Sequence, residues 1–186
     1  MARIGLDNFL YGILTEAQDG TPTYGVAKKP GKAISCSVSI SNNNASLYAD
    51  NGLAESDTSF QSGTVSMELD NADITTQATL LGHSIDAGTG EMTKNANDIA
   101  PYVGFGRIIT KMVNGNYQYT VKFLHKVKFS EPSQDNATKG ESVEFGTTTI
   151  EGVVSTLASG KWSTEATFDT KTEAQTYLNS FFTVSA

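Results

Sequence analysis

Apolar and polar residues alternate with a period of two over several short segments of the chain, and this pattern predicts β-strands. The clearest segments are 33–41, AISCSVSIS, and 63–70, GTVSMELD. Their inward positions are Ile34, Cys36, Val38 and Ile40 in the first segment and Val65, Met67 and Leu69 in the second. Each segment is therefore expected to place one face on a core, with Cys36 as a core residue and not a nucleophile.

Turn signals divide the rest of the chain into further strands. Residues 101–113 and 116–129 flank Asn114-Gly115, the strongest short hairpin signal in the sequence. We also expect strands at 45–50, 142–156 and 161–168, the last two separated by a Ser159-Gly160 turn. Residues 52–63 are interpreted as a polar loop, and a bulge is expected near 107–109.

Two segments carry a helical pattern. Residues 71–82 have Asn71 as a possible N-cap and Gly82 as a C-terminal stop. Residues 170–182 begin with Thr170 and Glu173 in a capping box. The apolar stripe that follows is Ala174, Tyr177, Leu178, Phe181 and Phe182. We expect this C-terminal helix to cover the open face of its own sheet, with an exposed helix for a partner as the alternative.

Length and composition favour a single domain over residues 1–186. With 38% hydrophobic and 18% charged residues, the chain can bury a core. We predict a mainly β fold, a β-sandwich or barrel of about seven strands with one short flanking helix and a C-terminal helix. The single cysteine excludes an intramolecular disulfide and a zinc site of several cysteines. The N-terminal residues are too polar for a signal peptide, and no apolar run is long enough to span a membrane.

The sequence offers little material for catalysis. Two histidines, His83 and His125, and one cysteine are too few for most nucleophile and metal sites, and no metal-ligand spacing is present. Gly31-Lys32 and Gly160-Lys161 lack the other residues of a phosphate loop, and Gly104-Phe105-Gly106 lies inside a strand and not before a helix. We therefore expect no enzymatic activity, no cofactor and no metal.

Charge is distributed unevenly, with a net charge of −7 that disfavours tight binding of nucleic acid. Segment 41–98 contains nine acidic residues and one basic residue, whereas segment 99–130 contains five basic residues and no acidic one. The basic residues, Arg107, Lys111, Lys122, Lys126 and Lys128, form a basic hairpin complementary to the acidic segment. The two segments either neutralise each other within one subunit or join neighbouring copies head to tail.

Several short motifs together resemble a known family. They are IGLDNFLYGILTE and GTPTYG near the N-terminus, AISCSVSIS, SMELDNADI, LLG, APYVGFGR, and WSTEATFDTKTEAQTYLNSFF at the C-terminus. Over essentially the whole chain, these motifs are similar to the major tail protein of long-tailed, non-contractile bacteriophages of Gram-positive hosts. The resemblance implies a structural virion protein that assembles into stacked, hexameric rings and forms the tube through which DNA enters the host.

The resemblance also implies partners and contact regions. Contacts between subunits and rings would fall on an N-terminal arm, residues 1–32, and on the loop 47–62; the candidates are Leu6, Phe9, Leu10, Tyr11, Tyr24, Tyr48, Leu53 and Phe60. The apolar residues of the arm need burial, either by a neighbouring copy or by the sheet edge of the same chain. Acidic candidates for the lumen or for ring contacts are Asp50, Glu55, Asp57, Glu68 and Asp70.

The other implied partners are tail tip or baseplate proteins, a tail-terminator protein, and a tape-measure protein in the lumen. DNA would pass through without specific binding, and the tail would be assembled in the host cytoplasm. Two alternatives remain open: the inner tube of a contractile tail or related injection machine, and a monomeric β-sandwich binding module. The second would need exposed aromatic residues as a binding platform.

Overall fold

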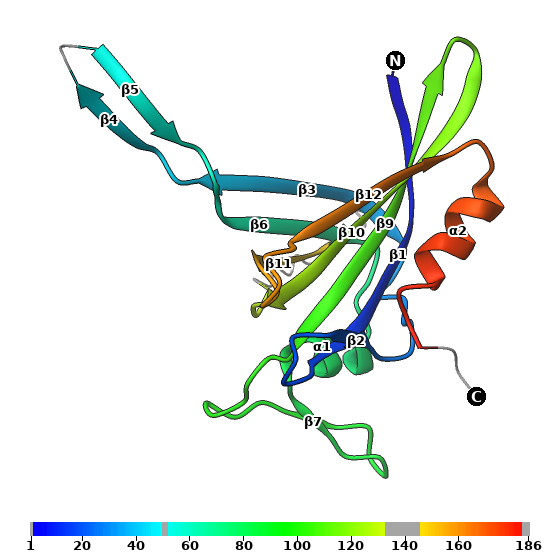
Figure 1. Ribbon diagram of the computed structural model, residues 1–186. Coiled ribbons are helices and arrows are strands. Elements are labelled where there is room, and N and C mark those ends of the chain that lie inside the picture. Colours follow the sequence, from blue (N-terminus) through cyan, green and yellow to red (C-terminus); the bar gives the residue numbers. More distant parts are fainter. Residues whose placement is uncertain (1, 50–51, 133–145, 184–186) are drawn as a thin grey trace, which may run out of the picture.

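The computed structural model describes residues 2–49, 52–132 and 146–183, apart from the side chains of 47–49 and 52–54 (Figure 1). One large antiparallel sheet contains β1 (Ala2–Glu16), β2 (Pro22–Tyr24), β3 (Ala33–Asn42), β6 (Phe60–Leu69), β9 (Tyr102–Val113), β10 (Asn116–Phe129), β11 (Thr148–Ser155) and β12 (Ser163–Phe168). Two separate hairpins are formed by β4 (Ala45–Ala49) with β5 (Gly52–Asp57), and by β7 (Ser84–Ile85) with β8 (Met92–Thr93). The helices are α1 (Ile74–Leu81) and α2 (Lys171–Asn179). The predicted mainly β class with two helices is confirmed.

The β9–β10 hairpin forms the centre of the sheet. Its turn is Asn114-Gly115, and both residues have positive φ, 51° and 85°, as a two-residue hairpin turn requires. β10 pairs with β9 on one edge, while its other edge pairs first with β12 and then with β11. A register shift between Leu124 and Val127 separates the two halves of β10. The extra residue of this bulge therefore lies in β10. Beside residues 107–109, where the sequence suggested a bulge in β9, a register shift of the β1–β9 pairing places the extra residue in β1, between Asp7 and Leu10.

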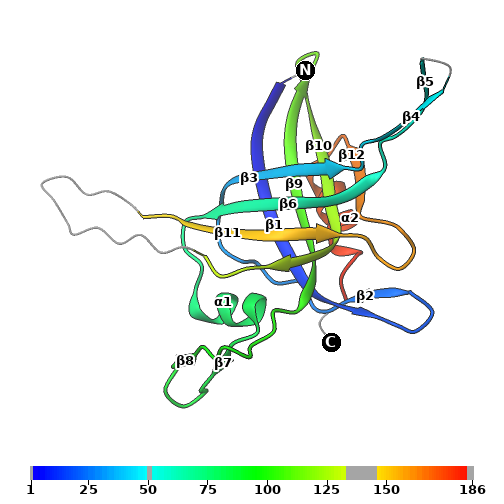
Figure 2. The same cartoon turned by 90° about the vertical axis from the view of Figure 1, so that its left-hand side faces the viewer.

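This branching divides the sheet into two layers with the main core between them. β3, β6 and β11 run across β1, β9 and β10 in Figure 2. The core between the layers includes Phe9, Val65, Met67, Leu69, Phe105, Leu124, Phe129, Ile150 and Val154. The predicted inward face of β6 is thus confirmed, since Val65, Met67 and Leu69 are fully buried.

The C-terminal helix covers the opposite face of β9 and β10. Its N-cap is Thr170, whose side-chain oxygen accepts a hydrogen bond from the Glu173 amide, as the capping box predicted. Ala174 and Leu178 are buried against Ile108, Val121 and Phe123. The prediction that this helix packs on its own sheet is confirmed. No helix among the described residues has the length and apolar character needed to cross a bilayer.

Helix α1 closes one end of the main core. Asp73, and not Asn71, is the N-cap, and its carboxylate accepts a hydrogen bond of 2.7 Å from the Thr76 amide. Gly82 ends the helix in the left-handed conformation, with φ 80°. Leu80 and Leu81 join the core between the layers, whereas Ile74 is half exposed.

The N-terminal segment is not a free arm. β1 pairs with β9 from Ala2 to Ile13, and β2 pairs with the end of β1. Phe9, Tyr11 and Tyr24 are buried in the chain's own cores, and Leu6 and Leu10 pack against those cores. The expectation that a neighbouring copy buries these residues is therefore wrong. β1 is buried on both faces along part of its length, so its apolar residues form a run without alternation, which resembles an irregular segment.

The region expected as polar loop contains strands. β4 and β5 pair with each other and form a hairpin that projects away from the layers (Figure 1), and β6 begins at Phe60. Phe60 stacks on Trp162 with 4.6 Å between ring centroids, so its own chain covers it. β4 confirms the strand expected at 45–50, whereas β5 was missed, because a hairpin outside a core needs no apolar alternation.

The inward face of β3 was only partly predicted. Cys36 and Val38 are half-buried against the main core, and burial raises the pKa of the Cys36 thiol. Ile34 and Ile40, by contrast, are 47% and 40% exposed. A register shift between Ala33 and Ser35 displaces Ile34, and Ile40 lies where β3 extends past the core.

Glycines in β9 allow α2 to approach the sheet closely. A Cβ atom built on Gly106 would lie 2.3 Å from Leu178 Cδ1 and 3.1 Å from Phe123 Cδ2.

Gly106→Ala is therefore expected to lower the free energy of unfolding by about 1–3 kcal/mol through overpacking, as measured by urea unfolding. The control is Gly146→Ala, where a Cβ meets no atom within 4 Å and a change below about 0.5 kcal/mol is expected. Equal stability of the two variants would show that α2 does not pack tightly on Gly106.

Candidate assembly surfaces and the His83 network

The outer face of the β3–β6–β11 layer presents small hydroxyl side chains and few charges. Strand pairing aligns three rows across it: Ser35–Glu68–Thr149, Ser37–Ser66–Glu151 and Ser39–Thr64–Val153. We call these nine residues the hydroxyl face. Its Glu68 carboxylate accepts hydrogen bonds of 2.9 Å from Ser35 Oγ and from Thr147 Oγ1. The Glu68 carboxylate is therefore held in place, and the nine residues of this face include two acidic side chains and no basic one.

The acidic candidates do not form a single cluster. Glu68 lies on the hydroxyl face, and Asp70 follows β6 at the end of the same strand. Asp70 Oδ1 accepts hydrogen bonds of 2.8 Å from the amides of Lys32 and Asn71, and the Lys32 bond in particular lowers its pKa. Glu55 and Asp57 lie exposed on β5, in the projecting hairpin. Asp50 lies outside the described residues, and the side chains of Tyr48 and Leu53 also lie outside the description.

Two of the five residues of the basic hairpin pair with carboxylates of their own chain, and neither carboxylate belongs to the acidic segment 41–98. Lys122 pairs with Glu165 and Lys126 with Glu16, each at 2.5 Å, and the ammonium groups of Lys126 and Lys128 lie over the Tyr102 ring. Arg107 differs from these lysines because it is buried in the middle of β9. A continuous basic edge is therefore absent from the described part of β9 and β10, contrary to one sequence-based expectation.

The free edge of β3 is the longest open strand edge of the large sheet. β3 has β6 as its only strand neighbour in the described sheet, and its ten residues continue directly into the projecting β4–β5 hairpin. An unpaired strand edge offers backbone N–H and C=O groups to another strand. The edge, the hydroxyl face and the hairpin thus belong to one layer of the sandwich.

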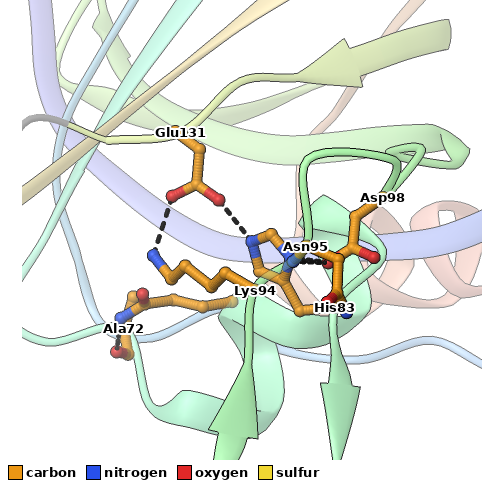
Figure 3. A network of polar contacts seen from close by, with 7 residues as sticks. Ala72, His83, Lys94, Asn95, Asp98 and Glu131 are labelled. Atoms are coloured by element: carbon orange, nitrogen blue, oxygen red, sulfur yellow. Dashed lines mark hydrogen bonds and ion pairs between the residues drawn. The ribbon is translucent and has the colours of Figure 1, made fainter.

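His83 is the centre of a polar network that the sequence did not predict (Figure 3). Its Nδ1 lies 2.7 Å from Asp98 Oδ2, and its Nε2 contacts Glu131 Oε1, while Lys94 Nζ lies 2.9 Å from the other Glu131 oxygen. The His83 side chain is only 6% exposed. These contacts join the end of α1, the loop after β8 and the end of β10.

The contacts of His83 connect three segments of the fold and occupy both nitrogens of its ring. Both ring nitrogens of His83 already contact carboxylates, so neither is free to act as a base toward a substrate. His125 is similarly engaged, with Nδ1 2.9 Å from the Tyr24 hydroxyl and Nε2 2.7 Å from Thr164 Oγ1. Burial lowers the pKa of His125, which favours a neutral ring. Among the described residues, no group of three or more acidic, histidine or cysteine side chains is arranged to hold a metal.

Comparison with protein-family models and with curated proteins finds no match for this chain.

The His83 network predicts an acid-sensitive contribution to stability. The Asn95 amide and His83 hold the pKa of Asp98 below its usual range. A carboxyl group whose pKa is lower in the folded state than in the unfolded state stabilises the fold at pH values above its unfolded pKa of about 3.9. This stabilisation is lost as the pH falls through the pKa of the folded state. Asp98→Asn should therefore lower the thermal midpoint at pH 7, and the difference should vanish near about pH 2.

Glu91→Gln, at an exposed position of the nearby loop, serves as the control and should leave the midpoint unchanged at both pH values. A deficit of Asp98→Asn that persists unchanged at acid pH would mean that the carboxylate charge is irrelevant and that only its shape matters.

Proposed function

We propose that this chain is a structural subunit that associates with copies of itself into stacked, hexameric rings and forms a phage tail tube that conducts DNA. The observation that carries the proposal is the long open edge of β3, which continues into a projecting hairpin. Adding strands at such an edge joins subunits through backbone hydrogen bonds without requiring a large apolar patch. The hydroxyl face, which includes residues of β3 itself, supports the same proposal.

The hydroxyl face supports the role of a lumen lining. Serine and threonine side chains with Glu68 and Glu151 give a hydrated, weakly acidic surface. Such a surface repels phosphate and gives a moving duplex no fixed contact. A net charge of −7 for each chain acts in the same direction in an assembly of many copies. The proposal also implies partners, namely tail tip or baseplate proteins, a tail-terminator protein and a tape-measure protein in the lumen. It further implies that the chain is part of the virion tail.

The open edge of β3 can be tested with lysines, which disfavour pairing between strand edges. Ile34→Lys with Ser39→Lys places two charges on exposed positions of β3. We expect the wild-type chain at high concentration to form rings or tubes in negative-stain electron microscopy and large species in sedimentation velocity. The double variant should remain monomeric with an unchanged circular dichroism spectrum.

The matched control is Ile74→Lys with Thr75→Lys, which adds the same charge at exposed positions of α1 and should still assemble. Wild-type chain that stays monomeric at every concentration, indistinguishable from the edge variant, would contradict the proposal. It would favour a monomeric binding module instead. Deletion of residues 1–32 is unsuitable here, because it would remove β1 from the sheet.

A second prediction concerns the hydroxyl face. Glu68→Lys with Glu151→Lys reverses both of its charges and should make assembled tubes retain double-stranded DNA in a sedimentation assay at low salt. The control is Asp86→Lys with Glu91→Lys, which makes the same charge change in the loop that joins β7 and β8. Tubes of this control variant should contain no DNA that is protected from nuclease. Equal nuclease-protected DNA in both variants would show that the hydroxyl face does not line the lumen.

A further inference from the structure

A cleft opens where the two layers of the sandwich separate. Its volume is about 640 Å³, and its walls come from β1, β3, β9 and β10 together with the segment 162–165. The apolar part of the lining includes Leu6, Val38, Ile109, Leu124 and Trp162. Its charged lining residues are Arg3, Arg107, Lys122 and Glu165, three basic residues and one acidic residue. The cleft is therefore apolar at its base and positively charged overall.

Arg107 is the unusual member of this group. It is 6% exposed, and its Nη1 atom is buried with no hydrogen-bond partner among the described residues. Its neighbour across the strand pair, Lys122, is already bound to Glu165. A buried guanidinium without an anion is costly, whereas a guanidinium paired with a carboxylate gains two strong, parallel hydrogen bonds. The cleft thus lacks one negative group at Arg107.

The chain itself carries an acidic element that its own body leaves exposed. The β4–β5 hairpin projects away from both layers in Figures 1 and 2, and its described acids, Glu55 and Asp57, are exposed. No basic residue lies between positions 41 and 93, so the hairpin complements the charge of the cleft. Asp57 already accepts hydrogen bonds from Ser59, at its amide and its hydroxyl, which leaves Glu55 as the better candidate to reach another copy.

We propose that the cleft is a carboxylate-binding site, in which Arg107 of one copy receives Glu55 from the β4–β5 hairpin of a second copy. This inference rests on the self-association proposed above and assigns its receptor and its ligand. The contact is heterologous, because the hairpin and the cleft are different surfaces, so each copy can donate to one neighbour and accept from another. Repetition of the contact generates a ring or a filament.

The stability of the free subunit distinguishes a binding arginine from a structural one. Arg107→Met removes an unpaired buried charge and retains an apolar side chain of similar length. We therefore expect the variant to have a thermal midpoint equal to or above that of wild type under monomeric conditions, while association weakens by at least about tenfold. Lys111→Met removes the same charge from the same strand outside the cleft and should leave both properties unchanged. A lowered midpoint for Arg107→Met would overturn the proposal, since the guanidinium would then support the fold.

Mixing two defective variants tests the direction of the contact. Arg107→Met can donate its hairpin but cannot accept one, and Glu55→Gln can accept but cannot donate. At a concentration at which each variant alone is monomeric in sedimentation velocity, an equimolar mixture should form heterodimers that do not extend through the cleft. Glu91→Gln is the matched control for Glu55→Gln and should assemble as wild type does.

The remaining outcomes separate this inference from the proposed function. If wild type forms tubes and Arg107→Met forms them equally well, the cleft proposal is wrong and the tube proposal survives. If the mixture forms heterodimers but wild type forms oligomers other than rings or tubes, the cleft proposal holds and the tube proposal fails. If succinate raises the midpoint of wild type but not of Arg107→Met, while Glu55→Gln assembles normally, the cleft binds a free carboxylate and not a second copy.

Discussion

The pairing of β10 with three different strands is the constraint on which the rest of the structure depends. β9 accompanies β10 on one edge, while β12 and β11 share the other edge on either side of the bulge at Leu124 to Val127. One additional residue in β10 at this point shifts the alternation of its side chains. Phe123 consequently faces α2, whereas Val127 and Phe129 face the core between the layers. A single strand therefore contributes side chains both to the core between the layers and to the core under α2.

Local patterns predicted the elements whose residues alternate cleanly or carry a specific turn or cap. Asn114-Gly115, the inward face of β6 and the Thr170 cap belong to this group. The patterns also predicted a strand at 45–50, where β4 lies. They did not predict β1, because a strand buried on both faces loses alternation, or β5, because a hairpin outside the core needs no alternation. The bulge in β10 was also missed, since its position depends on pairing with strands distant in sequence.

The surfaces were harder to predict than the strands. A count of charges along the chain groups Arg107 with four lysines, yet Lys122 and Lys126 reach carboxylates whereas Arg107 is buried in the lining of the cleft. The His83 network joins three segments whose approach is fixed by α1 and β10 together. Neither feature has a local signature, because each arises from contacts between residues far apart in the sequence. The hydroxyl face, by contrast, follows directly from the serine alternation of β3 once its neighbours are known.

The long sequence separation between β1 and β9 has a consequence for the timing of synthesis. Ala2 pairs with Met112, so β1 waits for about a hundred residues, some 5–20 s at ordinary elongation rates, before all of β9 has been made. The walls of the cleft are completed later still, when residues 162–165 emerge. The projecting hairpin is complete long before that. Residues of the β4–β5 hairpin are therefore synthesised well before the last residues that line the cleft, so a nascent chain can form the hairpin before it can form the cleft.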